Sequence, residues 1–275
     1  MVIRKWYFTT NVHGLRHAFD QIKVAVLSCQ ANLGLAPYCL VDGAGADGEI
    51  EARIQWLIDN GVSIIRHQAS MLNILRPKFQ EKMDIYSGHW LRCDIASLEA
   101  DDDFVLYTDI DVIFLKPLPE LLETPKYIAC APEHQRSDYS YFNSGVIIMN
   151  IPALRARREN LIQVVEQRLP VTDPWDDQSA LNDLFKDEWL KLAPIWNWKP
   201  YWGANDDALI VHFHGPKPAH ALRMQLGQLD PIGSDFRKIY ERNPAGYTHY
   251  LEIFQTISSS NTTLVNRATA ISTVA

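Results

Sequence analysis

The chain has 275 residues and a formal net charge of -7, with 47% hydrophobic and 21% charged residues. The length suffices for one large domain with a sizeable core, and the composition is that of an ordinary globular protein. The acidic balance argues against broad nucleic-acid binding, which relies on clustered Lys and Arg, so we expect no nucleic-acid partner.

The first half of the chain alternates between predicted strands and helices. Apolar residues recur on one face of the helix that follows the Gly-rich turn 43–48, and Gly61 is placed to end that helix. Such alternation predicts a largely parallel sheet covered by helices. The predicted strands are 5–9, 38–42, 62–65 and 104–108, and the other predicted helices are 19–32 and 88–98.

The second half is more mixed. We predict strands over 146–150 and 209–213 and a helix that opens at Pro152, a residue well suited to a first helical turn. From residue 257 the chain is rich in Ser, Thr, Asn and Ala. We therefore expect one α/β domain over 1–256 and a loosely ordered or partner-dependent tail over 257–275.

Targeting signals and cysteine pairs are missing from the sequence. No apolar run approaches the roughly 20 residues of a membrane span, and no apolar stretch follows the basic start as in a signal peptide. The four cysteines form no Cys-x-x-Cys pair, which favours small buried residues in a reducing compartment. We expect a cytoplasmic protein without a transmembrane segment, one that could also bind peripherally at the inner membrane face.

Two acids follow the apolar run 104–108 directly. Side chains two apart on extended chain point the same way, so Asp109 and Asp111 can converge on one ion. Ligands of open α/β sheets gather beyond the carboxyl ends of the strands, and two carboxylates there suit Mg²⁺ or Mn²⁺. The alternative is a charged strand end in water. The acids at 101–103 follow no strand, and we interpret them as a solvated loop. Apolar neighbours such as Ile110 and Val112, which we expect to face the core, make unpaired charge at 109 and 111 costly.

Five segments, in order, resemble one enzyme family. They are Trp90-Leu-Arg92, the acidic strand 105–114, Phe142-Asn-Ser-Gly-Val-Ile-Ile-Met-Asn150, Asp177-Gln-Ser-Ala-Leu-Asn182 and Val211-His-Phe-His-Gly-Pro-Lys-Pro218. Together they resemble the retaining GT-A glycosyltransferases of family 8, the group that includes glycogenin and bacterial lipopolysaccharide galactosyltransferases. The resemblance covers roughly residues 90–218. It implies a single Rossmann-like GT-A domain whose mixed, mostly parallel sheet is flanked by helices.

The resemblance also implies an activity. A sugar would move from a nucleoside diphosphate sugar, most often a UDP-sugar, to a hydroxyl of a glycan, a lipid-linked or a protein acceptor. Retention of the anomeric configuration and a Mn²⁺ or Mg²⁺ cofactor belong to the same implication. Asp109 would then contact both cation and donor, while Asp177 would bind donor-sugar hydroxyls and Gln178 would lie beside the reacting carbon. A helix cap is the alternative for the acids at 176 and 177.

Other residues of these segments have two interpretations each. Arg92 offers a charged fork for phosphate or sugar hydroxyls, or it is a surface helix arginine. Asn143, Ser144 and Gly145 place small and amide groups before a strand, where a backbone can approach a sugar, or they form a plain turn.

The segment 211–218 would supply the third metal ligand and a phosphate contact. His212 is favoured over its competitor His214 as that ligand, and Lys217 would reach the diphosphate. The family usually has two residues between Gly and Lys and a Trp after Pro. This chain has only Pro216 between Gly215 and Lys217, and Ala219 follows Pro218.

Two more features complete the predicted site. By position Thr9, Thr10 and Asn11 follow the first strand, where the nucleotide base would bind, or they form an ordinary turn. Trp189, Trp196, Trp198 and Trp202 could line an acceptor groove or pack in the core, and alternation would send the rings at 196 and 198 to one face.

Two rival functions remain open at this point. The first is a sugar-phosphate nucleotidyltransferase, although the segment 9–14 lacks the basic Gly-rich loop of such enzymes. The second is a non-catalytic module that binds sugar nucleotides or glycans. Candidates for metal, phosphate and sugar binding all occur together, which disfavours the second.

Overall fold

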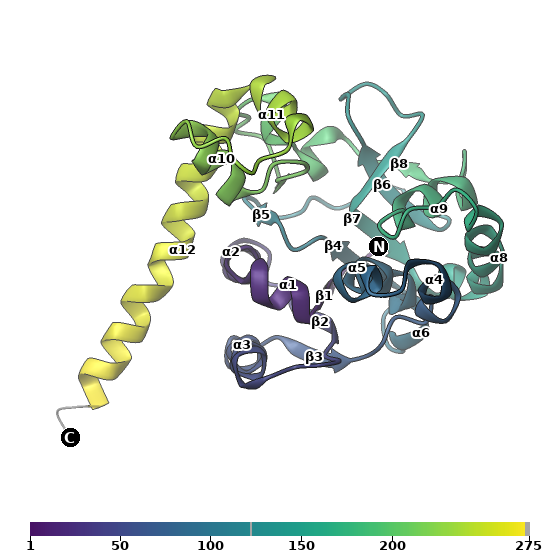
Figure 1. Cartoon of the computed structure of the whole chain (residues 1–275), viewed down its shortest axis with the longest axis horizontal. Coiled ribbons are helices and arrows are strands. Elements are labelled where there is room, and N and C mark those ends of the chain that lie inside the picture. Colours follow the sequence, from purple (N-terminus) through teal and green to yellow (C-terminus); the bar gives the residue numbers. More distant parts are fainter. Residues whose placement is uncertain (122, 273–275) are drawn as a thin grey trace.

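The computed structural model describes residues 1–121 and 123–272, with side chains up to residue 260. Its centre is a seven-stranded sheet in the order β3-β2-β1-β4-β7-β6-β8 (Figure 1). The strands are β1 (Lys5–Asn11), β2 (Ala36–Asp42), β3 (Ser63–Arg66), β4 (Phe104–Thr108), β6 (Ile128–Pro132), β7 (Phe142–Asn150) and β8 (Leu190–Lys191). Most neighbours run parallel, and only β7 is antiparallel to both β4 and β6 within this sheet. The predicted mostly parallel α/β fold is confirmed.

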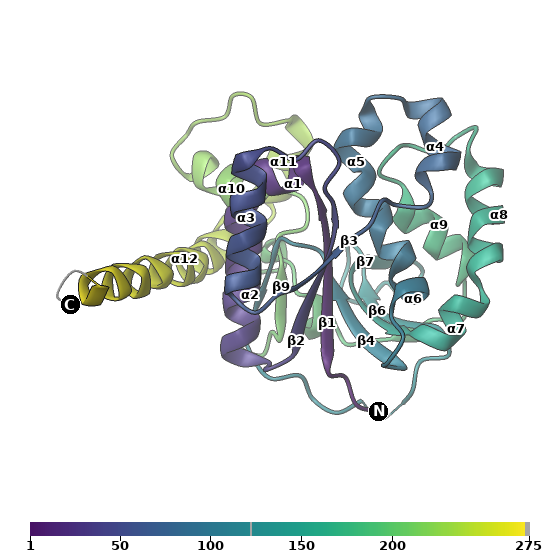
Figure 2. The same ribbon diagram turned by 90° about the horizontal axis from the view of Figure 1, so that it is seen from below.

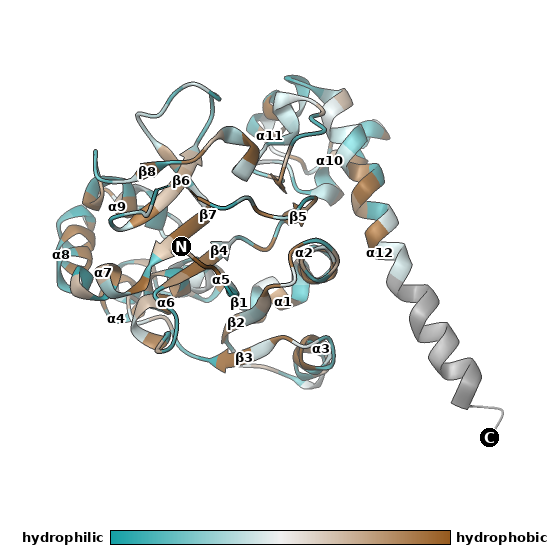
Figure 3. Cartoon of the chain, turned by 180° about the vertical axis from the view of Figure 1, so that it is seen from behind, coloured by the Kyte–Doolittle hydropathy of each residue, from teal (hydrophilic) through white to brown (hydrophobic). Residues whose placement is uncertain are grey.

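Helices cover both faces of the sheet (Figure 2). One face carries α2 (Phe19–Asn32) and α3 (Gly48–Asp59); the other carries α4 (Leu72–Phe79), α5 (Lys82–Trp90), α6 (Ile95–Leu98), α7 (Ile151–Ala156), α8 (Arg158–Arg168) and α9 (Asp177–Leu184). Alternate residues of each strand enter different cores, as the two-residue period of extended chain requires. In β1, Trp6 and Phe8 pack toward α2 and α3, while Tyr7 packs toward the other face. The apolar central strands stand out in Figure 3.

A second, two-stranded sheet pairs β5 (Val112–Phe114) with β9 (Ile210–His212). A third buried cluster surrounds it and includes Phe213, Tyr247 and Tyr250. The remaining elements are α1 (Val12–His17), α10 (Pro218–Gln225), α11 (Ser234–Glu241), α12 (Pro244–Ser272) and the 3₁₀ turns η1 (Leu91–Asp94), η2 (Pro194–Asn197) and η3 (Pro200–Trp202). Within the described residues, no helix combines the length and apolar character of a bilayer-crossing segment.

Several predicted elements differ in detail. The helix expected over 88–98 is the end of α5 followed by η1 and α6, and the helix expected from Pro152 is divided at Arg157 into α7 and α8. The strands expected over 5–9 and 146–150 are longer, because β1 pairs with β2 as far as Asn11 and β7 pairs with β6 from Phe142. The expected tail begins inside α12, and residues 273–275 lie outside the described residues.

The acids at 101–103 were predicted to be solvated, and for one of them this is wrong. Asp102 is buried, pairs with Arg4 and lies 3.6 Å from the Lys5 ammonium nitrogen. Arg4 directly precedes β1, and Lys5 is its first residue. Arg4 is 98 residues from Asp102, so local sequence does not reveal this pairing. All four cysteines are free, and only Cys93 is partly exposed, as expected of small interior residues.

Candidate active site

The loop after β4 carries the two acids that the sequence singled out. The Asp109 amide donates to the Gly145 carbonyl (2.9 Å), which fixes the start of the loop on β7. Three residues after Asp109 the chain enters β5, whose Val112 pairs with His212 of β9. This pairing brings together groups about 100 residues apart in sequence. One oxygen of Asp109, one of Asp111 and a ring nitrogen of His212 all lie within 4.8 Å of one another.

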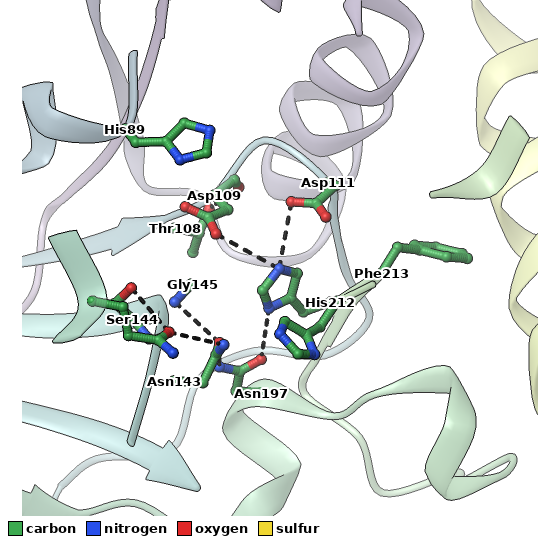
Figure 4. Close-up of polar contacts among 12 residues, drawn as sticks. His89, Thr108, Asp109, Asp111, Asn143, Ser144, Gly145, Asn197, His212 and Phe213 are labelled. Carbon is green, nitrogen blue, oxygen red and sulfur yellow. Dashed lines mark hydrogen bonds and ion pairs between the residues drawn. The ribbon is translucent and has the colours of Figure 1, made fainter. Parts of the chain in front are cut away.

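The orientation of the His212 ring follows from a chain of hydrogen bonds (Figure 4). The Gly145 amide can only donate, so the atom of Asn143 that it meets at 3.0 Å is the acceptor Oδ1. Asn197 Nδ2 donates to the same oxygen (2.7 Å), which turns Asn197 Oδ1 toward His212 Nδ1 at 3.1 Å. That Nδ1 must then carry the hydrogen and donate.

His212 Nε2 faces the two acids, and in the neutral ring with its hydrogen on Nδ1 it carries a lone pair. It lies 3.4 Å from Asp111 Oδ1 and 3.7 Å from Asp109 Oδ2. Two carboxylates with one imidazole form a donor set suited to Mn²⁺. The hydrogen bond on the far ring nitrogen is the support that metal-binding histidines usually have. These three residues fit a divalent cation.

Gly145 makes room for the imidazole. A Cβ atom built on Gly145 would lie 2.1 Å from His212 Cε1 and 2.6 Å from His212 Nδ1. Asn143, Ser144 and Gly145 were predicted to precede a strand, but they lie inside β7, paired with β6 from Phe142 onward. The glycine is needed here for close packing of a side chain, since it lies in regular extended structure.

Arg92 is the centre of a buried polar network and not the surface helix residue of the alternative interpretation. Its Nη2 lies 2.8 Å from Asp109 Oδ1, and its Nη1 donates to the Ser144 carbonyl (2.7 Å) and hydroxyl (2.8 Å). Its guanidinium also lies over the Tyr107 ring, 4.8 Å from the centroid. The Tyr107 hydroxyl donates to the same Asp109 oxygen (2.8 Å). Arginine therefore holds one oxygen of Asp109 and leaves the other toward His212.

Asp177 begins α9 beside Arg92. Its Oδ2 lies 2.8 Å from Arg92 Nε, but off the line of the N–H bond, and this oxygen has no hydrogen-bond partner among the described residues. Burial raises the pKa of Asp177 to about 6, against the opposing pull of Arg92. No side-chain cap is found at the start of α9 within the described chain, so capping does not explain these acids.

Gln178 braces the backbone of β7. Its Oε1 accepts from the Ser144 amide (2.7 Å), with the Ser144 hydroxyl and Asn143 Nδ2 each at 3.2 Å. The predicted residues Arg92, Asn143, Ser144, Asp177 and Gln178 thus lie together in one hydrogen-bonded unit next to Asp109.

Lys217 reaches the same site from α10. Its Nζ lies 2.5 Å from Asp111 Oδ2, so the shortened spacing after Gly215 still brings the ammonium group to the acids. Burial would raise the pKa of Asp111, but the adjacent Lys217 ammonium holds it well below its usual range. Asp111 is therefore a carboxylate at neutral pH.

The residues predicted to contact a nucleotide base lie at the end of β1 and not after it. Thr9 donates to the Gly88 carbonyl (2.8 Å), Thr10 is buried, and Asn11 caps α1 by accepting from the Gly14 amide (2.8 Å). Asn11 also lines an open hollow of about 710 Å³ together with His13, Arg16, Asp42, Asp84 and Ile85. The hollow lies at the carboxyl ends of β1 and β2.

The two histidines that competed in the sequence occupy different clusters. His214 faces Glu133 (Nε2 to Oε1, 2.9 Å), and these two form a second potential ligand group with His134. Sequence reasoning missed Glu133, Tyr107 and Asn197, because each acts through tertiary contacts; Tyr107 lies within the acidic segment 105–114, but nothing local marks its hydroxyl as a partner of Asp109.

The tryptophan cluster was only partly anticipated. Trp196 belongs to the buried cluster on the α2–α3 side of the sheet, whereas Trp198 belongs to the cluster around the β5–β9 sheet. The prediction that both rings share a face is wrong, because Pro194–Asn197 forms the 3₁₀ turn η2 and not a strand. Trp189 and Trp202 also pack against buried clusters, so these rings serve the core.

Known proteins resemble this chain in sequence. The profile of the family described as glycosyl transferase family 8 matches residues 26–221. Glucoside xylosyltransferase 1 of Danio rerio is 25% identical over half of this chain and 46% of its own length. The chain spans less than half the length of the curated relatives that it matches.

Solved structures share the fold. The apo form of the glycosyltransferase GlyE of Streptococcus pneumoniae TIGR4 superposes with a TM-score of 0.60 at 22% identity, covering 94% of this chain and 64% of GlyE. The galactosyltransferase LgtC, in complex with donor and acceptor sugar analogs, gives a TM-score of 0.61 at 20% identity, covering 86% of this chain and 99% of LgtC. The GT-A fold is therefore confirmed.

Proposed function

The chain belongs to glycosyl transferase family 8, and from this we propose that it transfers a sugar from a UDP-sugar to a hydroxyl acceptor with retention of configuration. One observation carries the proposal. Two carboxylates, of Asp109 and Asp111, and Nε2 of His212 converge within 4.8 Å of one another beyond the carboxyl end of β4, and Asn197 holds the other ring nitrogen. Such a site suits a Mn²⁺ ion, or Mg²⁺ in its place. A cation bound there would stabilise the negative charge that grows on the departing diphosphate.

Charge near the leaving group would also come from Lys217. In the absence of donor its ammonium group pairs with Asp111 (2.5 Å) and is partly exposed. A diphosphate entering beside Asp111 would offer this flexible point charge a second anionic partner. Lys217 would then hold the leaving group in place.

The donor sugar would lie over the pair Arg92–Asp177. The buried, unpartnered oxygen of Asp177 needs a hydrogen-bond donor, and a sugar hydroxyl supplies one. The Arg92 guanidinium lies against the Asp177 carboxylate on one side and donates to Ser144 on its other side. These contacts leave the guanidinium little freedom to move. Asn143, Ser144 and Gln178 would form the wall beside the anomeric carbon.

The nucleoside would occupy the hollow at the ends of β1 and β2. Asn11 and Asp42 lie at the paired ends of these strands and both line the hollow. In this proposal Thr9, Thr10 and Asn11 shape the pocket, since Thr9 and Asn11 already bond to the chain itself.

Departure of the diphosphate leaves a carbon with cationic character, which the acceptor hydroxyl attacks. For retention, the acceptor would approach the face that the diphosphate leaves, and a phosphate oxygen would take its proton. No protein base is then required, in keeping with the arginine-paired state of Asp177. The acceptor is a glycan, lipid-linked or protein hydroxyl, and the names of the xylosyltransferase relatives make glucosides the first to test.

The experiment is release of UDP from a panel of UDP-sugars, including UDP-xylose, UDP-glucose and UDP-galactose, with and without Mn²⁺. We expect Mn²⁺-dependent release with at least one donor, and its loss in Asp109→Asn and Asp111→Asn. Asp206→Asn, an exposed acid away from the site, is the matched control. Near-normal turnover in both site variants would refute the mechanism, and pyrophosphate formation from UTP and a sugar phosphate would point to a nucleotidyltransferase instead.

A further inference from the structure

We propose that Glu133, His134 and His214 form a second metal site, which takes a transition-metal cation of the Zn²⁺ class. His214 Nε2 lies 2.9 Å and His134 Nε2 lies 3.9 Å from the same oxygen, Glu133 Oε1. The three ligand atoms lie within 4.8 Å of one another, and none belongs to the cluster of Asp109, Asp111 and His212.

The hydrogen bonds around His214 prepare its Nε2 as a ligand. The Tyr201 hydroxyl lies 3.2 Å from the Glu133 carbonyl, to which it donates, and 3.2 Å from His214 Nδ1. With its own hydrogen on the carbonyl, the hydroxyl accepts from Nδ1–H, and Nε2 then turns a lone pair toward Glu133 Oε1. A cation bound between Nε2 and Oε1 would use both lone pairs. Without one, the ring carries its hydrogen on Nε2 and donates it to Glu133 Oε1, so cation binding would exchange that hydrogen for the metal.

Glu133 is held by its other oxygen. Asn143 Nδ2 donates to Glu133 Oε2 (2.6 Å), and the hydrogen-bond chain from Gly145 fixes that amide orientation. Oε1 is thus left for a metal, and a buried carboxylate is oriented before any ion arrives. Metal sites commonly have this support behind their ligands, here Asn143 behind Glu133 and Tyr201 behind His214.

The two clusters differ in donor set, which predicts different metals. Asp109, Asp111 and His212 offer two carboxylates and one imidazole, whereas the second cluster offers two imidazoles and one carboxylate. Nitrogen-rich sites suit Zn²⁺, and oxygen-rich sites suit Mn²⁺ and Mg²⁺. The His134 side chain is 61% exposed, so the second site opens to solvent and an ion can enter without unfolding.

Zn²⁺ itself is the probe for the test. Full-length protein is stripped with chelator and dialysed against about micromolar free Zn²⁺, and the bound ions are counted by mass spectrometry. We expect His134→Gln to bind one ion fewer per chain, with affinity at that site at least about 100-fold weaker, since even loss of a supporting residue costs 10–100-fold. His214→Gln should lose the same ion, which guards against misfolding of either variant.

Two controls assign the ions. Asp111→Asn should leave the His134-dependent ion bound, so failure of the proposed catalytic cation site and failure of this second site give different results. On α1, His13 and His17 form a separate histidine pair, with ring centroids 4.5 Å apart. His17→Gln removes one member of that pair and should also leave the His134-dependent ion bound. An unchanged zinc count in both His134→Gln and His214→Gln would overturn the proposal, as would displacement of the His134-dependent ion by equimolar Mn²⁺.

Discussion

Gly145→Ala tests whether the position of the His212 ring sets cation binding. The added Cβ would lie 2.1 Å from His212 Cε1, against an ordinary contact of at least 3.4 Å, so one of the two groups must move by about 1.3 Å. The ring is buried and its Nδ1 is bonded to Asn197, which leaves little room for that movement. Moving Nε2 by this amount separates it from the two acids. We expect roughly 100-fold lower catalytic efficiency, as misplacement by about 1 Å commonly costs.

The assay is UDP release as a function of Mn²⁺ concentration, with thermal unfolding measured in parallel. Overpacking of this kind costs about 1–3 kcal/mol of folding stability, so the variant should fold while its half-saturating Mn²⁺ concentration rises. Gly48→Ala is the control, because a Cβ there meets nothing within 4 Å and Gly48 begins α3. Wild-type activity and Mn²⁺ dependence in Gly145→Ala would refute the reasoning.

Three further predictions concern the same site. Arg92→Lys keeps the charge but cannot contact Asp109, Asp177 and Ser144 together. Denaturant unfolding should show that the free energy of unfolding falls by about 3 kcal/mol, and kinetics should show a weaker affinity for the donor. Unchanged values of both would contradict the network. Because the pKa of Asp177 is raised to about 6, donor binding that needs its carboxylate should weaken as pH falls below 6, and Asp177→Asn should lack this pH dependence. The same shift means that the folded chain holds this proton more tightly than the unfolded chain, so stability decreases by about 3 kcal/mol as pH rises from about 4 through 6; the variant's unfolding curve should lack that decrease. Finally, Mn²⁺ with UDP at 100 times their dissociation constant should stabilise the wild type by about 2.7 kcal/mol in a thermal-shift assay, and should leave Asp111→Asn unshifted.

Local pattern was enough to predict the central strands and the acids that follow β4. The run 104–108 is β4 with the predicted bounds, because buried parallel strands are short apolar segments that sequence reveals directly. Asp109 and Asp111 do converge as predicted, but from the bent loop between β4 and β5 and not from extended chain. The strands β5, β6 and β8 were not predicted. Three or two residues carry no periodicity in β5 and β8, and the small residues and the proline of β6 give no strand pattern.

The surroundings of the site required the three-dimensional structure. The local sequence does not indicate that Asn197 bonds to His212 Nδ1. Asn197 lies in another segment, and the 3₁₀ turn η2 brings its side chain to the histidine. Strand pairing likewise brings His212, and not His214, beside Asp109 and Asp111, since Val112 lies opposite His212. The cap that Asn11 gives α1 and its bonds to α5 were not predicted, although Asn11 also lines the hollow at the ends of β1 and β2.

The most direct test is a crystal of the full chain grown or soaked with MnCl₂ and UDP, with data collected for anomalous scattering of manganese. A manganese peak is expected about 2.1 Å from oxygens of Asp109 and Asp111 and from His212 Nε2, with diphosphate oxygens completing its coordination. A map with UDP bound but no manganese between these three residues, or with the ion held elsewhere on the chain, would contradict the proposed cation site.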